Sequence, residues 1–244
     1  MPTKKIAVVT GGSSGIGAAL VQRWRLRGYE VVAADFDPQD DAVFVDVRDF
    51  DGCHQLMSEV IERYGRVDIV ALNAGVNSRL RPGDPLDLLA YRGHLAVELD
   101  GVVFGIDAAV RGFRGRGGAI VVTGSLSALA PEVSNPLYSL AKSAVLGYVR
   151  AMSTPLWAHG ITVNAVCPGL VDTPLLADRR ARLVTQGFPL LSPDDVAVAM
   201  ESAVDSGMTG KAWAVIAGRA PFVYEYPEVP PALLPSGRPA PSPA

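Results

Sequence analysis

Tyr138 and Lys142, four residues apart, form the pair in this sequence with the clearest chemical potential. They fall in a segment with helical spacing, so this separation places both side chains on one face of a helix. An ammonium group beside a phenol favours the phenolate and lowers the tyrosine pKa from about 10 toward neutrality. Such a tyrosine can take a proton from an alcohol. The pair is suggestive only, because the same spacing also arises by chance.

Ser125 stands thirteen residues before Tyr138, just after the apolar run Ala119–Thr123. The run is typical of a buried strand, and open α/β sheets gather their ligands at the carboxyl ends of strands. We therefore expect the Ser125 hydroxyl to hold a substrate oxygen.

A glycine-rich turn near the N-terminus indicates a nucleotide site. The stretch TGGSSGIG, Thr10 to Gly17, joins the apolar run Ile6–Val9 to a helix-compatible segment. Backbone N–H groups in such a turn, together with a helix N-terminus, suit a pyrophosphate. A purely structural tight turn is the alternative, but the order of strand, turn and helix favours a nucleotide.

Asp35 ends the next apolar run, eighteen residues after Gly17. A carboxylate at about this distance accepts hydrogen bonds from an adenosine ribose and repels a 2′-phosphate. No arginine or lysine occurs in the glycine turn or directly after Asp35, so the sequence favours NAD over NADP. The alternative for Asp35 is an ordinary turn residue at a strand end.

The pattern of hydrophobic residues predicts the fold that positions these candidate residues. Apolar strand-like runs alternate with segments of helical spacing, which predicts a doubly wound, parallel, Rossmann-like α/β sheet in a single domain. The expected strands are Ile6–Thr10, Glu30–Asp35, Ala42–Val47, Val67–Leu72, Ala119–Thr123, Ile161–Val166 and Ala212–Ala217. The expected helices are Gly15–Arg27, Gly52–Tyr64, Leu86–Arg114, Pro136–Ala158 and Pro193–Asp205, the last with Ser192 as its N-cap. We assign residues 1–220 to this domain and residues 221–244 to a proline-rich tail that is partly disordered.

Composition narrows the partners. The chain has 244 residues, 49% of them hydrophobic, and a formal net charge of −3. Without a lysine- or arginine-rich block it lacks the positive field that nucleic acids or anionic membranes require. No apolar stretch reaches the roughly 18 residues of a membrane span. We expect a small-molecule partner and a cytoplasmic location, with Cys53 and Cys167 as reduced, buried thiols and no metal site around the scattered histidines.

Five ordered motifs resemble those of the short-chain dehydrogenase/reductase family over roughly residues 5 to 218. They are Thr10-Gly11-x-x-x-Gly15-x-Gly17, Asn73-Ala74-Gly75, Ser125, Tyr138-x-x-x-Lys142 and Pro168-Gly169. The resemblance implies an NAD(P)-dependent oxidoreductase that acts as a homodimer or homotetramer through its long helices. We predict a reaction in which hydride passes between NAD and a secondary alcohol or ketone of apolar character.

The resemblance also implies residue roles. Tyr138 would be the acid/base, Lys142 would bind the nicotinamide ribose, and Ser125 would orient the substrate oxygen. Asp46 would contact adenine, and Thr173 would bond the carboxamide. The full set of predicted cofactor contacts is Gly11, Ser13, Ser14, Gly15, Ile16, Gly17, Asp35, Phe36, Asp46, Val47, Asn73, Ala74, Gly75, Tyr138, Lys142, Pro168, Gly169, Val171 and Thr173.

Glu98 is one departure from the family pattern, which places an asparagine three residues before the glycine that is Gly101 here. In the family that asparagine holds a water that links the catalytic lysine to solvent. As a fourth candidate catalytic residue, Glu98 could hold such a water, pair directly with Lys142, or point away. Our hypothesis is that it keeps a proton relay, with an onset of rate at higher pH than an asparagine would give. Glu98 also keeps open a non-catalytic NAD(H)-binding regulator or scaffold as the alternative function.

Residues Leu170–Pro189 match the position of the family's substrate lid and are largely apolar. They also carry the basic cluster Arg179-Arg180-Ala181-Arg182. The cluster either recognises an acidic substrate or forms a solvated helical face, and the sequence favours the second.

Overall fold

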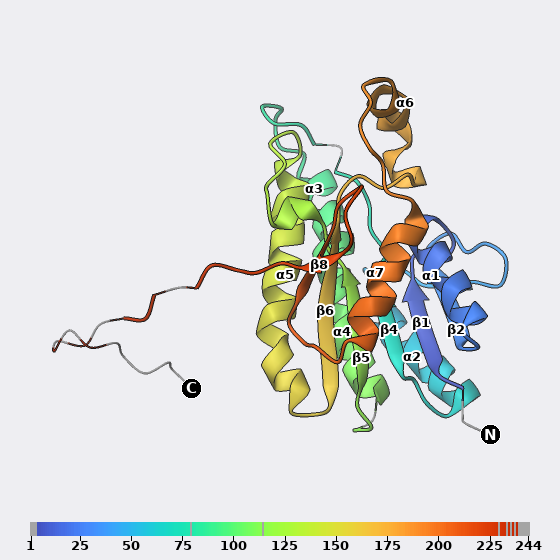
Figure 1. The fold of residues 1–244 in the computed structure, drawn as a ribbon. Coiled ribbons are helices and arrows are strands. Elements are labelled where there is room, and N and C mark those ends of the chain that lie inside the picture. The colour runs from blue at the N-terminus through green and yellow to red at the C-terminus, as the bar shows by residue number, and fades with distance from the viewer. Residues whose placement is uncertain are drawn as a thin grey trace.

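The computed structural model describes residues 4–78, 80–113, 115–228, 230–232, 234, 236 and 238. Within them lies one eight-stranded sheet of order β3-β2-β1-β4-β5-β6-β7-β8 (Figure 1). Each neighbouring pair is parallel except β7 with β8. The strands are β1 (Ile6–Thr10), β2 (Glu30–Asp35), β3 (Val43–Phe44), β4 (Ile69–Leu72), β5 (Gly118–Thr123), β6 (Ile161–Pro168), β7 (Ala212–Val215) and β8 (Phe222–Val223). This topology confirms the predicted doubly wound, Rossmann-like class.

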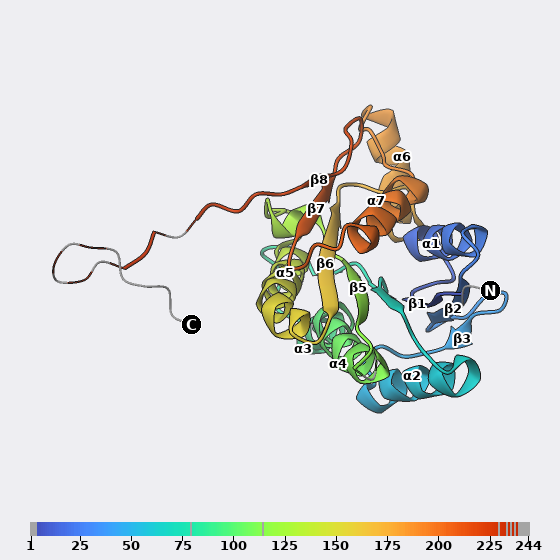
Figure 2. The ribbon, with the colours of Figure 1, turned by 60° about the horizontal axis from the view of Figure 1, so that its bottom comes forward.

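Helices cover both faces of the sheet, which explains why its strands are apolar on both sides. Figure 2 shows α1 and α7 on one face and α2, α4 and α5 on the other. The α-helices are α1 (Gly15–Leu26), α2 (Phe50–Tyr64), α3 (Leu88–Leu95), α4 (Gly101–Phe113), α5 (Pro136–Trp157), α6 (Ala177–Thr185) and α7 (Pro193–Asp205). The predicted N-cap of α7 is confirmed: Ser192 and Asp195 form a reciprocal capping box.

The predicted helix Leu86–Arg114 is interrupted. Helix α3 begins after Asp87, whose carboxylate accepts from the N–H groups of Leu89 and Ala90. A π-helical turn, Ala96–Asp100, then separates α3 from α4. A π turn inserts an extra residue and commonly marks a functional position. Glu98 lies in this turn. Arg114 lies outside the described residues.

The sheet extends past residue 220, the residue at which we predicted the catalytic domain to end. Phe222 and Val223 pair antiparallel with Ala214 and Trp213 of β7. Tyr224 and Tyr226 then pack against the core on the α2/α4/α5 face. The first residues of the segment that we assigned to the tail therefore pack against the sheet and its core. Of the tail predicted to be partly disordered, residues 229, 233, 235, 237 and 239–244 lie outside the described residues.

Two further sequence expectations concern single features. Cys53 and Cys167 are free thiols and both are buried, and burial raises the pKa of each to about 11. Among the described residues, none of the helices combines the length and apolar character that spanning a bilayer would demand.

Candidate active site

A cavity of about 810 Å³ opens at the carboxyl ends of the strands, the edge at which parallel sheets bind ligands. Its wall includes the glycine turn, the end of β2, the segment after β4, the end of β5, α5 and the segment after β6. The predicted site residues that line it are Gly11, Ser14, Gly15, Ile16, Asp35, Phe36, Asp46, Val47, Asn73, Ala74, Gly75, Glu98, Ser125, Tyr138, Lys142, Pro168, Gly169, Val171 and Thr173. Ser13 and Gly17 are not among the lining residues.

The glycine turn brings backbone close to backbone. Gly11 and Gly15 have φ of +64° and +53°, in the left-handed region that favours glycine. A Cβ on Gly11 would lie 2.9 Å from the Cα of Ala74, and a Cβ on Gly17 would overlap the Gly11 carbonyl oxygen. Gly17 therefore serves the packing of α1 onto the turn. Gly11 and Gly15, together with Ile16 in the first turn of α1, form a cradle of backbone at a helix N-terminus, which suits an anion.

Asp35 is held by the glycine turn itself. Its Oδ2 accepts a hydrogen bond from the N–H of Ser13 at 3.0 Å, and its Oδ1 accepts from the N–H of Asp37 at 3.2 Å. Ser13 therefore contacts Asp35 but does not line the cavity. The position of Asp35 at the end of β2 is the one that a ribose-binding carboxylate requires.

Arg48 is a residue that sequence reasoning missed at this end of the cavity. Its guanidinium binds the Asp46 carboxylate, with Nε 2.8 Å from Oδ1 and Nη2 2.7 Å from Oδ2. This pairing lowers the pKa of Asp46 below its ordinary value. Arg48 also lies over the Phe36 ring, 5.3 Å from its centroid. Its position two residues after Asp46 was the available signal.

Asn73, in the cavity wall, links the carboxyl ends of β1, β4 and β5. Its Nδ2 donates to the carbonyl oxygens of Thr10 and Gly11 at 3.2 and 3.1 Å, and its Oδ1 accepts from the Thr123 hydroxyl at 2.9 Å. Thr10, also missed as a site residue, accepts from the N–H of Asn73 through Oγ1 at 3.1 Å. These bonds fix the glycine turn relative to the end of β5, which precedes Ser125.

Helix α5 positions the tyrosine and the lysine. Asn135 is its N-cap and accepts from the N–H of Tyr138, and Pro136 occupies the first helical position. One turn on, Lys142 lies with its Nζ 5.6 Å from the centroid of the Tyr138 ring and donates to the Thr123 carbonyl at 2.8 Å. Ser125 lies near enough to Tyr138 to lower the pKa of the phenol, which favours the phenolate. The structure thus brings the three predicted catalytic side chains together.

Glu98 pairs directly with Lys142. Its Oε2 lies 2.8 Å from Nζ, and the two side chains are 1% and 5% exposed. Its Oε1 accepts from the N–H of Val76 at 2.6 Å. Of the three arrangements that the sequence left open, the direct ion pair is the one observed.

The ion pair changes the electrostatics around the phenol. Burial raises the pKa of Tyr138 above its ordinary value, Lys142 and Ser125 lower it, and Glu98 and Glu132 raise it, so that the pKa is raised overall. For Lys142, burial is the largest influence and lowers the pKa, but Glu98, Tyr138 and Cys167 together outweigh it, so that the pKa is raised overall and the ammonium stays charged. Sequence reasoning considered the effects of Lys142 and Glu98 on the tyrosine, but not those of burial and Glu132.

His94, which sequence reasoning also missed as a neighbour of the site, is buried one helical turn before Glu98. The centroids of its ring and of the Tyr138 ring are 6.3 Å apart. Burial lowers the pKa of His94, an effect that Glu98 opposes. A neutral imidazole therefore packs beside the phenol.

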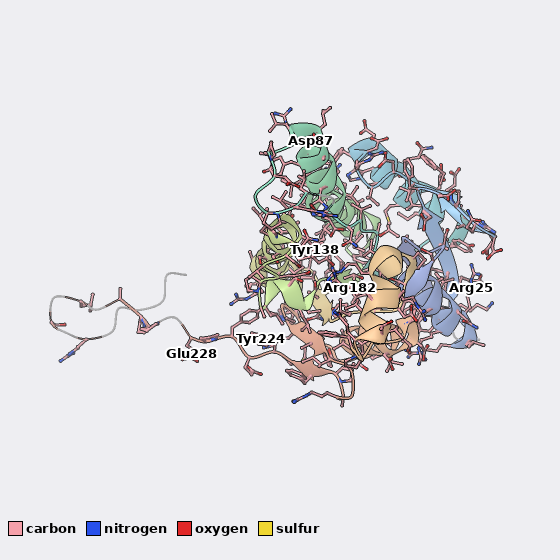
Figure 3. All side chains as sticks on the ribbon, turned by 90° about the horizontal axis from the view of Figure 1, so that it is seen from above. Arg25, Asp87, Tyr138, Arg182, Tyr224 and Glu228 are labelled. Atoms are coloured by element: carbon pink, nitrogen blue, oxygen red, sulfur yellow. The ribbon has the colours of Figure 1, made fainter. Side chains whose placement is uncertain are left out.

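Helix α6 rises above the sheet, over the end that holds the cavity (Figure 1). Figure 3 looks down on this end and labels Tyr138 and, on α6, Arg182. Arg182 is exposed, and Arg180 forms a two-bond pair with Asp172 at 2.6 and 2.8 Å. Arg179 differs from both, because it lines the cavity. The solvated-face interpretation therefore holds for Arg180 and Arg182 only.

Comparison with known proteins agrees with this fold. A family model described as short chain dehydrogenase matches residues 5–183. The chain is 34% identical over 218 residues to cis-4-hydroxycyclohexanecarboxylate dehydrogenase from Sinomonas cyclohexanicum, covering 81% of this chain and 88% of that protein. It is 32% identical over 192 residues to 15-hydroxyprostaglandin dehydrogenase [NAD(+)] from Mus musculus, covering 70% and 69%.

A solved structure agrees as well. The 3-ketoacyl-(acyl-carrier-protein) reductase from Brucella melitensis, complexed with NADH, superposes with a TM-score of 0.79 at 25% identity, covering 88% of this chain and 98% of that one. A parallel sheet with a tyrosine, a lysine and a serine at its nucleotide-binding edge defines the class of Rossmann-like oxidoreductases. The chain belongs to the short-chain dehydrogenase family within that class, as its sequence motifs predicted.

Proposed function

We propose that this protein is an NAD-dependent oxidoreductase that transfers hydride between the nicotinamide and a secondary alcohol or ketone, with Tyr138 as acid/base. The observation that carries the proposal is one cavity that holds Tyr138, Lys142 and Ser125 together with the glycine turn at the N-terminus of α1. The names of two relatives, both dehydrogenases of hydroxy compounds, support the reaction class.

The residues present fit a dinucleotide. The backbone cradle of Gly11 and Gly15 would hold the pyrophosphate, since both glycines line the cavity at the N-terminus of α1. Asp35 would bind the adenosine ribose, and Thr173 the carboxamide. Bound NAD would supply a hydride acceptor at C4 of its nicotinamide. One relative named for NAD(+) and one neighbour complexed with NADH support a nicotinamide cofactor.

Charge at the adenosine end supports NAD rather than NADP. Asp35 and Asp37 both line the cavity there, and two carboxylates repel a 2′-phosphate. Arg48, the cationic side chain nearby, is already engaged with Asp46. A phosphate would therefore have to compete with a carboxylate for it.

In alcohol oxidation, Ser125 would hold the substrate oxygen while the Tyr138 phenolate takes its proton and the hydrogen on carbon leaves as hydride. In ketone reduction, the Tyr138 phenol returns the proton to the oxygen. Positioning of this kind removes several kcal/mol of barrier because the reacting groups are already in line. Lys142 would bind the nicotinamide ribose and favour the phenolate.

Glu98 would act through Lys142 as a positioning residue. The direct contact holds the ammonium in place without an intervening water and gives the lysine a proton acceptor. The same carboxylate offsets the lysine's charge, so the phenolate would form at higher pH than beside an unpaired lysine. This arrangement is consistent with our hypothesis that Glu98 takes part in a proton relay and that the rate rises at higher pH than it would with asparagine.

The substrate class and the oligomeric state are also proposals. The cavity wall near Tyr138 includes Leu126, Ala130, Leu175 and Leu176, which suits a substrate of apolar character. We also propose a homodimer or homotetramer, as the family resemblance implies.

The test is Tyr138→Phe. The variant should still bind NADH in isothermal titration, since the other predicted cofactor contacts remain. It should lose nearly all turnover across a panel of secondary alcohols, followed by the absorbance of NADH. Turnover close to that of the unaltered chain would contradict the proposal.

A regulator or scaffold that binds NAD(H) without turnover is the second candidate. The Glu98–Lys142 ion pair favours it, because it offsets the charge on which an acidic phenol depends. Tight NADH binding without activity on any alcohol or ketone between neutral and alkaline pH would select this function.

A further inference from the structure

Charged side chains in the cavity fall into three groups. Asp35, Asp37, Asp46 and Arg48 belong to the adenosine end, and Glu98 and Lys142 form the buried pair beside Tyr138. The third group is Arg179 with Glu132. It joins the lid helix α6 to the loop before α5, across 47 residues of sequence. The proposed function gives this third pair no role.

The pair lies at the catalytic end of the cavity. Glu132 is near enough to Tyr138 for its charge to raise the pKa of the phenol. Its backbone N–H also donates to the hydroxyl of Ser139, the residue after Tyr138, at 2.8 Å. A ligand group held by Arg179 would therefore lie in the part of the cavity that contains Tyr138.

Glu132 is fixed by its own loop, whereas Arg179 is held loosely. The Glu132 Oε1 accepts from the Ser134 hydroxyl at 2.6 Å, and both terminal nitrogens of Arg179 lie 3.3 Å from the same oxygen. Charge-assisted hydrogen bonds of this kind are usually about 2.7–2.9 Å long. The Arg179 side chain is 37% exposed, so its pairing is also screened by solvent.

The guanidinium keeps the capacity to bind a second acid. It carries five N–H donors in a planar fork that matches a carboxylate, and Glu132 engages it through a single oxygen. The neighbouring wall is apolar, contributed by Leu126, Ala130, Leu175 and Leu176. In a largely apolar pocket, a few polar groups fix orientation and specificity.

From this geometry we propose that the substrate is a hydroxy acid or keto acid with an apolar body, and that Arg179 binds its carboxylate. Glu132 holds the guanidinium over the cavity until the acid enters. Arg179 is then a specificity-determining residue. The inference rests on the proposed oxidoreductase function and adds the class of its substrate.

Matched ligand pairs test this inference. Three hydroxy acids of increasing size, 3-hydroxybutyrate, 4-hydroxycyclohexanecarboxylate and 12-hydroxyoctadecanoate, are each compared with their own carboxamide. Members of a pair differ in charge and hardly in size. Affinities are measured by isothermal titration of the full chain, with and without NADH, and turnover is followed separately.

At least one acid should bind about tenfold or more tightly than its amide, as a charge-assisted hydrogen bond to arginine gives. Arg179→Gln should bring that acid-to-amide ratio close to one. Glu132→Gln, which removes the competing carboxylate, should increase it. Arg180→Gln is the matched control, since Arg180 pairs with Asp172 on the surface, and it should leave the ratio unchanged.

The inference falls if no acid is preferred over its amide, or if the preference survives in Arg179→Gln. Failure of the proposed function gives a different result. Acid-specific binding that depends on Arg179, without turnover of any ligand, would uphold the carboxylate site and overturn the proposed oxidoreductase function. Equal turnover of acids and amides would uphold the oxidoreductase function and overturn the carboxylate site.

Discussion

Nζ of Lys142 lies 2.8 Å from Oε2 of Glu98, and neither side chain is more than 5% exposed. A second oxygen of the same carboxylate accepts from the N–H of Val76, in the segment after β4 that lines the cavity. One carboxylate thus joins the lysine of α5 to the wall of the nucleotide site. The lysine is held more rigidly than a solvent-linked ammonium, and its effect on Tyr138 is weaker.

Replacing Glu98 by asparagine should move alcohol oxidation to lower pH. Without the carboxylate, the charge of Glu98 no longer raises the tyrosine pKa, which should fall as long as Lys142 stays protonated. The kcat/KM for oxidation depends on the phenolate, so its rising limb should shift down by the same amount. The profile is measured with a secondary alcohol and NAD. Titration of the phenolate absorbance, with Tyr138→Phe as the blank, gives the same pKa without turnover.

The control is Glu201→Gln, because Glu201 is also a largely buried acid but pairs with Arg23 and Arg27 away from the cavity. That variant should leave the pH profile unmoved. A profile in Glu98→Asn that coincides with that of the unaltered chain would show that Glu98 has no electrostatic role.

Glu98→Leu should destabilise the fold. It leaves the buried Lys142 ammonium without its anion, and breaking a buried pair from one side costs roughly 3–5 kcal/mol. The free energy of unfolding is measured by urea denaturation. Adding Lys142→Met should recover most of the loss, since an apolar pair of similar volume is often as stable as an ion pair. If the double variant is no more stable than Glu98→Leu, the lost stability comes from poor packing of the leucine and not from the unpaired ammonium.

Gly75→Ala should be harmful because of Glu98. A Cβ on Gly75 would lie 2.8 Å from Glu98 Oε1, tighter than an ordinary contact, and the carboxylate cannot retreat while it holds Lys142 and Val76. We expect a loss of about 1–3 kcal/mol in the free energy of unfolding. In a Glu98→Ala background the added methyl has room, so the two changes should not be additive. Equal costs in both backgrounds would contradict this account.

Local patterns predicted most of the scaffold. Short apolar runs, the glycine turn and the cap at Ser192 each depend on a few neighbouring residues, and the sheet follows from their alternation. The break in the predicted helix Leu86–Arg114 was not predictable in this way, because helical spacing of apolar residues continues through Ala96–Asp100 without a glycine or proline inside it. A π turn changes hydrogen bonding while leaving that pattern nearly intact.

Pairings between distant residues could not be predicted from the sequence. The sequence identified Glu98 as unusual, but its arrangement depends on the distance between the π turn and α5. The pairing of Arg179 with Glu132 was equally unpredictable, because it depends on where α6 lies relative to the loop before α5. Arg48 lies thirteen residues after Asp35, outside the segment in which a basic residue would indicate NADP. The short β3 instead brings the chain back so that Arg48 lies over Phe36.

Asp35→Asn should raise the use of NADP relative to NAD. Asparagine keeps an oxygen that can accept from the N–H of Ser13, so the glycine turn should retain its shape, while the charge that repels a 2′-phosphate is removed. The ratio of kcat/KM for NADP to that for NAD should rise about tenfold or more, since juxtaposed like charges cost several kcal/mol. Asp41→Asn, at an exposed carboxylate paired with Arg25, is the matched control and should leave the ratio unchanged. If Asp35→Asn loses activity with NAD and gains none with NADP, Asp35 supports the turn but does not select the cofactor.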